Sequence, residues 1–408
     1  MPQWDHPLWQ SLLPLGRSEP SGGYRRYSFT DADSACRDWF GKAARQRNLR
    51  VDCDRDGNLW AWWDAPSGPA TGAIVAGSHL DSVPDGGAFD GPLGVVSAFA
   101  AIDLMRERGV RPVRPVGVVA FVEEEGARFG VACLGSRLLT GVIAPERARE
   151  LADADGVTLA EAMAGAGLDP ERIGADPGLR ERVAAFVELH IEQGSALDGL
   201  GAAVGVGESI WPHGRWRIDF SGRADHAGTT RLADRRDPML PFAAAVLAAR
   251  EAAAEVGALA TMSKVVAVPG GANGICSAVQ AWLDARAPDE ERLHRLVGLI
   301  MESARAAGDQ HQVTVTSTCE SLTPVTEFDL DLRDRVVTAL AGAGVNAPVL
   351  PTGAGHDAGV LAGVLPAAML FVRNPSGVSH SPAEYAEPAD CAAGVTALAT
   401  VLAELACR

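Results

Sequence analysis

The sequence predicts an α/β protein whose mixed, mainly parallel sheet is flanked by helices, with a smaller α+β domain inserted into it. Three observations lead to this fold class. Apolar runs that end in polar residues alternate with helical stretches along residues 1–210 and again along 327–408. Residues 211–326 instead contain strands with strict apolar and polar alternation, which is typical of a sheet with one exposed face. At 408 residues the chain also exceeds the size of one ordinary domain.

Composition and charge exclude several classes of function. Hydrophobic residues make up 47% of the chain, and the formal net charge of -16 argues against nucleic acid or an anionic membrane as a partner. The sequence has no uninterrupted apolar run of about 18 residues and no basic segment before an apolar core, so neither a membrane span nor a signal peptide is expected. The 7 cysteines are scattered without metal-binding spacing, which is typical of reduced thiols in a cytoplasmic protein.

The larger domain, residues 1–210 and 327–408, is expected to contain a hairpin at 51–63 and four buried apolar strands separated by helices. The strands begin at Ile74, Val116, Val183 and Pro366. The main helices are expected at about 31–47, 92–108, 331–343 and 388–407. Thr30 can cap the first of these helices, and Pro92 occupies the favoured first position of the second. Residues 145–182 are expected to form short surface helices.

The inserted domain, residues 211–326, is expected to have the element order βαββαβ, which is that of a ferredoxin-like unit. Its strands are expected at 215–221, 263–268, 278–286 and 312–319. Its helices are expected at about 238–256 and 289–307. In the first strand Trp216, Ile218 and Phe220 share one face, so one side of the sheet is apolar and the other is exposed.

Several apolar strands of the larger domain end in side chains that bind metal ions in proteins. These side chains are His79 with Asp90, Glu124 with Glu125, His190, and His380. In an open parallel sheet the carboxyl ends of the strands share one edge, so residues far apart in sequence can converge there. A single histidine is more often structural, and an acidic run such as 123–125 is usually a solvated face. The prediction therefore depends on their joint occurrence at successive strand ends.

The ligand types in this set indicate the kind of metal. Three histidines with two or three carboxylates suit Zn²⁺, Mn²⁺ or a similar ion, and not a thiolate site. With one bridging carboxylate, five ligands suffice for two ions about 3.5 Å apart. Asp81, two residues after His79, is placed to accept a hydrogen bond from the second imidazole nitrogen.

These motifs resemble those of the dinuclear-metal aminoacylase and carboxypeptidase superfamily. The resemblance is strongest to its amidase branch, which holds N-carbamoyl-L-amino acid hydrolases, β-ureidopropionases and allantoate amidohydrolases. The matching stretches are 77–83, 87–91, 123–129, 188–194, 226–230, 353–358 and 379–384. They occur in family order and cover most of the chain, so together they are specific.

The resemblance implies two divalent metal ions per subunit, Zn or Mn, with Ni and Co as alternatives. It implies that His79, Asp90 and His190 bind one ion. It also implies that Asp90, Glu125 and His380 bind the second, so that Asp90 bridges the two.

The same resemblance assigns roles around the reacting bond. Glu124 is implied as the general base, and Gln193, His226, Asn273 and Arg286 are implied to face the substrate. Arg286 would bind a substrate carboxylate, which a bidentate guanidinium does well, although a solvated strand-end charge is the alternative. His226 would also stabilise the oxyanion. In the family, the inserted domain forms a homodimer and contributes residues to the partner's site.

The implied reaction is hydrolysis of a ureido or amide C–N bond in a small carboxylate substrate, with ammonia and carbon dioxide released from a carbamoyl group. Overall resemblance slightly favours allantoate over N-carbamoyl-L-amino acids or a related N-acyl compound. An aminoacylase or dipeptidase is the alternative, disfavoured because the peptidase branches usually carry a carboxylate where His190 stands. An inactive metal-binding homologue is disfavoured because Glu124 and all five ligands are present. Arg231 and Cys276 stand where the family commonly has proline.

Overall fold

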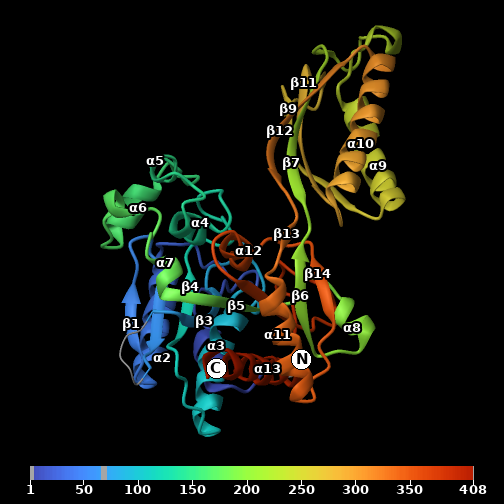
Figure 1. Cartoon of the computed structure of the whole chain (residues 1–408). Coiled ribbons are helices and arrows are strands. Elements are labelled where there is room, and N and C mark those ends of the chain that lie inside the picture. Colours follow the sequence, from blue (N-terminus) through green and yellow to red (C-terminus); the bar gives the residue numbers. More distant parts are fainter. Residues whose placement is uncertain (1–3, 66–70, 408) are drawn as a thin grey trace. The chain divides into compact units, whose positions relative to one another are not determined.

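The chain divides into two compact units in the computed structural model, which describes residues 4–65 and 71–407 (Figure 1). The first unit comprises Met1–Glu208 and Glu327–Arg408, and the inserted unit comprises Ser209–Thr326. Each unit buries its own cluster of apolar side chains.

Among the described residues, a nine-stranded sheet forms the centre of the first unit, in the order β1-β2-β4-β3-β5-β15-β6-β13 with β14 paired to β6. The strands are β1 (Arg50–Cys53), β2 (Leu59–Trp63), β3 (Ala73–His79), β4 (Val116–Phe121), β5 (Val183–Ile191), β6 (Val204–Ile210), β13 (Thr326–Glu327), β14 (Val349–Thr352) and β15 (Ala367–Val372). The four central strands β4, β3, β5 and β15 are parallel, and β2 and β6 pair antiparallel on either side. The expected mixed, mainly parallel sheet is confirmed.

Helices cover the central strands, which are buried because nearly all of their residues are apolar. The helices of this unit are α1 (Pro7–Leu12), α2 (Asp31–Gln46), α3 (Pro92–Glu107), α4 (Leu134–Thr140), α5 (Pro145–Arg149), α6 (Leu159–Gly165), α7 (Leu179–Arg182), α8 (Ala196–Leu200), α11 (Leu330–Gly342), α12 (Asp357–Ala362) and α13 (Pro388–Ala406), with a 3-10 turn at Pro170–Arg172. α3 and α13 pack on each other and on β3, while α12 packs on β5 and β15. Thr30 caps α2 as expected, because its hydroxyl accepts from the Asp33 amide.

Within the described part of the chain, α13 alone is long and apolar enough to cross a membrane by length and composition. Of its apolar window, 61% is buried inside the protein, where the helix packs on α3, α11 and β15. Burial in the core therefore explains the composition of this helix.

Two parts of the first unit differ from the expectation. Residues 1–30 show no periodicity in the sequence, yet α1 forms there and buries Leu8, Trp9 and Leu12. Six residues are too few for a helical period to be visible. The short helices within 145–182 do not only lie on the surface, because they enclose a second apolar cluster. This cluster contains Phe129, Leu134, Leu138, Ile143, Ala148, Leu159, Ala162, Met163 and Ile173.

The inserted unit is an antiparallel sheet in the order β12-β7-β11-β9, with α9 and α10 packed together along one face (Figure 1). Its elements are β7 (His213–Ser221), β8 (Asp225–His226), a 3-10 turn (Leu232–Asp234), α9 (Met239–Val256), β9 (Leu259–Val268), β10 (Gly274–Ile275), β11 (Ala278–Arg286), α10 (Glu290–His311) and β12 (Thr314–Thr323). Trp216, Ile218 and Phe220 are buried with the two helices, while their neighbours along β7 are more exposed. A separate two-stranded ladder joins β8 to β10.

Candidate metal centre

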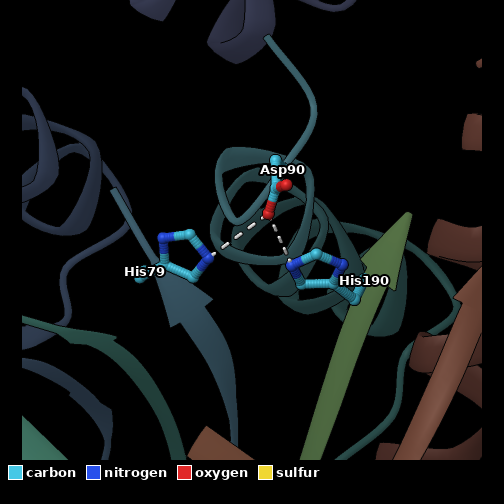
Figure 2. Close-up of side chains that lie close together, drawn as sticks. All are labelled: His79, Asp90 and His190. Carbon is cyan, nitrogen blue, oxygen red and sulfur yellow. Dashed lines mark ion pairs between the residues drawn. The ribbon is translucent and has the colours of Figure 1, made fainter. Parts of the chain in front are cut away.

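The ends of two neighbouring parallel strands bring three of the sequence-predicted ligands together. His79 is the last residue of β3, His190 is the penultimate residue of β5, and Asp90 lies just before α3. Figure 2 shows both imidazoles pointing at the Asp90 carboxylate. Nε2 of His190 lies 3.2 Å from Asp90 Oδ1, and Nε2 of His79 lies 3.6 Å from the same oxygen. All three side chains are buried.

A second group of potential ligands lies on the other oxygen of the same carboxylate. Nε2 of His380 lies 3.3 Å from Asp90 Oδ2 and 3.6 Å from Glu125 Oε2. Within each of the two groups, one ligand atom per residue lies within 4.8 Å of the others. The Asp90 carboxylate thus belongs to both groups, with a different oxygen facing each.

The start of α3 lets the imidazole of His79 lie against the backbone next to Asp90. Gly91 adopts φ 82°, a conformation that favours glycine, and Pro92 follows as the first helical residue. A Cβ atom at Gly91 would collide with the His79 ring. The glycine therefore serves both the turn and the close approach of the histidine.

The protonation of the two buried histidines fits a bound cation. Nδ1 of His190 lies 2.8 Å from the Ile191 carbonyl oxygen, and Nδ1 of His79 lies 3.2 Å from the Asp81 carbonyl oxygen. Carbonyl oxygens only accept, so each Nδ1 carries a proton, and in the neutral ring each Nε2 then offers a lone pair. Both Nε2 atoms are buried without a hydrogen-bond partner in the described structure. A lone pair that faces a carboxylate oxygen across 3.2 to 3.6 Å is the arrangement expected where a metal ion lies between them.

The electrostatics of the groups around Asp90 are dominated by burial and by close charges. Burial, followed by the nearby Asp90, raises the pKa of Glu125 to about 7. For Asp90 itself burial acts in the upward direction, but the close imidazoles of His190, His380 and His79 hold its pKa well below the usual range. Such a concentration of carboxylates in a buried site favours a bound divalent cation, which would stabilise their ionised forms.

Asp81 and Glu124 lie next to this cluster. The carboxylate of Asp81 accepts from the backbone amides of Glu124 and Glu125 at 3.2 and 3.0 Å, and it lies 3.5 Å from His79 Nδ1. Oε2 of Glu124 lies 3.5 Å from His79 Nε2, while its Oε1 accepts from the Cys133 thiol at 3.3 Å. Asp81 therefore ties the end of β3 to the turn that follows β4.

That turn depends on an unusual backbone conformation. Glu123 adopts φ 56°, which is uncommon for a residue other than glycine. Its buried carboxylate accepts from the amides of Arg128 and Phe129 at 2.8 and 2.7 Å, so the loop that follows stabilises the turn. The reversal places Glu124 beside His79 at the end of β3 and Glu125 beside His380, rather than along a solvated face.

Three further groups contact Asp90. The side-chain amide of Gln193 donates to Asp90 Oδ2 at 2.9 Å, and the Ser379 hydroxyl donates to the same oxygen at 3.2 Å. Oε1 of Glu384 accepts from the amides of Phe89 and Asp90, each at 2.9 Å. Gln193 is a sequence-predicted site residue, whereas Ser379 and Glu384 are not. The signal for both is their place in the 379–384 stretch that carries His380.

His356 is a further residue of the site to which the sequence assigned no role. It is buried, and its ring lies 4.5 Å from that of His190. Burial and the neighbouring His190 hold its pKa well below the usual value, so the imidazole is neutral. Its position immediately before α12 was visible in the sequence, but its packing on His190 requires the fold.

The remaining sequence-predicted residues lie in the inserted unit. His226 pairs with Gly274 in the β8–β10 ladder, and the Ala227 amide donates to the Asn273 carbonyl at 3.1 Å, so His226 and Asn273 lie side by side. Arg286 is the last residue of β11, at the end of the strand that is remote from the Asn273 loop. The β11–β7 register pairs Arg286 with His213.

The length of β11 separates the two groups of predicted substrate residues. The strand spans 9 residues, from Ala278, which follows the Asn273 loop, to Arg286. At roughly 3.3 Å per residue, its two ends are about 26 Å apart. The guanidinium of Arg286 is paired with Asp284, with Nε at 2.8 Å from Oδ1. The structure thus brings His226 and Asn273 together and holds Arg286 away from them within one chain.

A mainly parallel sheet with histidines and carboxylates gathered at its strand ends defines a class, the metal-dependent hydrolases of α/β fold. Comparison with known sequences identifies the family within that class. The profile of peptidase family M20/M25/M40 matches residues 75–404, and the chain belongs to this family.

Relatives within the family are amidohydrolases. The chain is 38% identical over 403 residues to an N-carbamoyl-L-amino acid amidohydrolase of Geobacillus stearothermophilus, covering 98% of each protein. It is 31% identical to the allantoate amidohydrolase of Escherichia coli, covering 95% of this chain and 94% of that one. A solved amidase of the hydantoinase/carbamoylase family from Burkholderia vietnamiensis matches with a TM-score of 0.87 and 30% identity over 98% of this chain and 97% of that chain. The resemblance to the amidase branch is confirmed.

Proposed function

We propose that this protein is a metal-dependent amidohydrolase that cleaves the ureido C–N bond of a small linear carboxylic acid. The observation that carries the proposal is the shared Asp90 carboxylate, with partnerless Nε2 atoms of two buried histidines on one oxygen and His380 with Glu125 on the other. The names of the relatives supply the substrate class. N-carbamoyl-L-amino acids are favoured over allantoate, because the relative named for them shares 38% identity against 31%. This preference reverses the slight preference for allantoate drawn from the motifs.

The proposed metal ligands are the two groups of side chains that lie close together around Asp90. His79, Asp90 and His190 would hold one divalent cation, and Asp90, Glu125 and His380 would hold the second. Zn²⁺ and Mn²⁺ suit this mixture of imidazole and carboxylate, and Co²⁺ and Ni²⁺ share the preference. Two such cations supply Lewis acidity for the activation of water and the polarisation of the substrate carbonyl.

Glu124 is the proposed general base. Its carboxylate is buried beside His79, and it is held on one side by the Cys133 thiol. In the reaction Glu124 takes a proton from the attacking water and delivers it to the nitrogen that leaves. Asp81 orients the imidazole of His79 and the turn that carries Glu124, and acts through these groups.

Gln193, His226, Asn273 and Arg286 are the proposed substrate-binding residues. Arg286 would take the substrate carboxylate, and His226 would donate to the oxygen of the reacting carbonyl. Because about 26 Å of strand separates Arg286 from His226, one small substrate cannot contact both residues of a single chain. This separation supports a homodimer in which one copy supplies His226 with Asn273 and the other supplies Arg286.

The state of the cysteines supports a location in a reducing compartment. All seven are free thiols, and four of them are buried in the fold. We therefore propose a cytoplasmic location for the enzyme.

The proposal is tested by ammonia release from purified protein loaded with Mn²⁺ or Zn²⁺. The substrates are N-carbamoyl-L-amino acids, their D-enantiomers, allantoate, and N-formyl and N-acetyl amino acids. We expect turnover of the N-carbamoyl-L-amino acids, with allantoate slower. Hydrolysis of dipeptides without ammonia release from any ureido compound would show that the protein is a peptidase of the same family.

A further inference from the structure

The loop that follows β8 holds the imidazole of His226 from one side only. Nδ1 of His226 lies 2.9 Å from the backbone nitrogen of Gly228 and 3.1 Å from that of Thr229, and both amides donate to it. The ring is otherwise exposed at the edge of the inserted unit. The two amides therefore decide what the exposed Nε2 atom can do.

A backbone N–H can only donate a hydrogen bond. Since two of them point at Nδ1, that atom must offer its lone pair, and the single proton of the neutral ring must reside on Nε2. This is the opposite of the arrangement in the metal centre. There Nδ1 of His79 and of His190 faces a carbonyl oxygen and Nε2 carries the lone pair.

We propose that Gly228 and Thr229 lock His226 as the Nε2–H tautomer, which fixes the donor role already proposed for this residue and leaves Nε2 unable to act as a base or as a metal ligand. The catalytic half of this inference rests on the proposed amidohydrolase function, whereas the tautomer does not. As the carbonyl carbon becomes tetrahedral, its oxygen gains negative charge, and a donor held in place by the backbone stabilises that charge without reorganisation.

The loop has its own supports, so the two amides are fixed in place. The Thr230 amide donates to the His226 carbonyl at 3.2 Å, which closes the turn. The guanidinium of Arg235 donates to the carbonyl of Thr230 at 3.1 Å and to that of Ala227 at 2.7 Å. The Ala227 amide in turn donates to Asn273. Arg235 is therefore a positioning residue that acts through the loop.

The space around the ring explains why glycine occupies position 228. A Cβ atom there would lie 3.2 Å from Cε1 of His226 and 3.5 Å from Nδ1. An alanine would press on the edge of the imidazole, which would have to shift slightly relative to the two amides. Gly228→Ala thus tests the lock without changing any charge.

The tautomer is measured directly by long-range ¹H–¹⁵N correlation spectra of the full-length protein with ¹⁵N-labelled histidine. The spectra are recorded at alkaline pH, because the tautomer is a property of the neutral ring. The His226 signals are identified by their loss in His226→Gln. We expect an unprotonated Nδ1 and a protonated Nε2. A proton on Nδ1, or an averaged mixture of the two tautomers, would overturn the proposal.

Kinetics test the consequence for the reaction. His226→Asn removes the donor at the Nε2 position, and we expect kcat to fall by about 10²–10³-fold with little change in KM. His226→Gln places an amide N–H near the Nε2 position and should recover part of that loss. Equal activity of His226→Asn and the unmodified enzyme would refute the role as donor, even with the expected spectrum.

Two more variants distinguish an effect on the His226 tautomer from a general loss of stability. Gly228→Ala and Arg235→Gln should lower kcat and shift the His226 ring signals towards the mixed tautomer. Arg236→Gln is the matched control, because Arg236 is the exposed neighbour and its removal changes the charge equally. A fall in kcat without movement of the ring signals would overturn the lock. If no ureido substrate is turned over at all, the proposed function fails, while the spectrum still decides the tautomer.

Discussion

The histidines of the metal centre and the histidine of the inserted unit are held as opposite tautomers of the imidazole ring. His79 and His190 are buried, and carbonyl oxygens at their Nδ1 atoms leave the Nε2 lone pairs facing Asp90. His226 is exposed, and two amides at its Nδ1 leave a proton on Nε2. The backbone group opposite Nδ1 therefore decides whether the imidazole can bind a cation or donate to an oxygen.

The two regions also differ in what stabilises them. Around Asp90, donors and acceptors come from segments as far apart in sequence as Glu384 and Phe89, and the side chains are buried. The His226 loop is held mainly by neighbours within ten residues and by one backbone bond to Asn273. A substitution in the metal centre should consequently affect cation binding and folding together, whereas one in the loop should affect turnover alone.

The largest effect is expected for Asp90→Asn. The amide that replaces one carboxylate oxygen cannot bridge two cations, so metal content should fall from two ions per chain to at most one and activity should be lost. Asp85→Asn is the matched control, because it removes the same charge five positions earlier from a carboxylate paired with Arg25. Metal content is measured by mass spectrometry after gel filtration. Two retained ions would show that Asp90 is not the bridge.

Adjacent glutamates should separate metal binding from proton transfer. Glu124→Gln should keep both cations and lower kcat by about 10²–10⁴-fold, the range expected for a general base. Glu125→Gln should instead lose the cation shared with His380. Activity of Glu124→Gln within tenfold of the unmodified enzyme would exclude it as the base.

The strand-end ligands were predictable because the signal is local. His79 is the last residue and His190 the penultimate residue of a mostly apolar strand, and parallel strands share one edge. Ser379, Glu384 and His356 were not predicted as members of the site, since their contacts with Asp90 and His190 join distant segments. Only the strand pairing reveals that Arg286 lies at one end of β11, whereas His226 lies in the separate β8–β10 ladder next to the other end.

A smaller effect is expected where the support of the bridge is removed. Glu384→Ala leaves the buried amides of Phe89 and Asp90 without their acceptor, which should cost about 1–3 kcal/mol of unfolding free energy. The Asp90 loop should also loosen, with a loss of about 10–100-fold in metal affinity, as for other residues that orient ligands. Competition with a fluorescent chelator measures the affinity. Unchanged affinity with lowered stability would make Glu384 a folding residue only.

The smallest effect is expected at Arg231, which stands beside the His226 loop but takes no part in holding it. Its side chain is 82% exposed and pairs only locally with Asp234, three residues on, at 2.7 Å. Exposed pairs of this kind contribute about 0–1 kcal/mol, so Arg231→Ala should leave the melting temperature nearly unchanged. Because Nδ1 of His226 is held by backbone amides and not by Arg231, kcat should stay within about twofold, in contrast to Arg235→Gln. A large fall in kcat with Arg231→Ala would mean that the side chain itself contacts the substrate, and the loop would then act through more than its backbone.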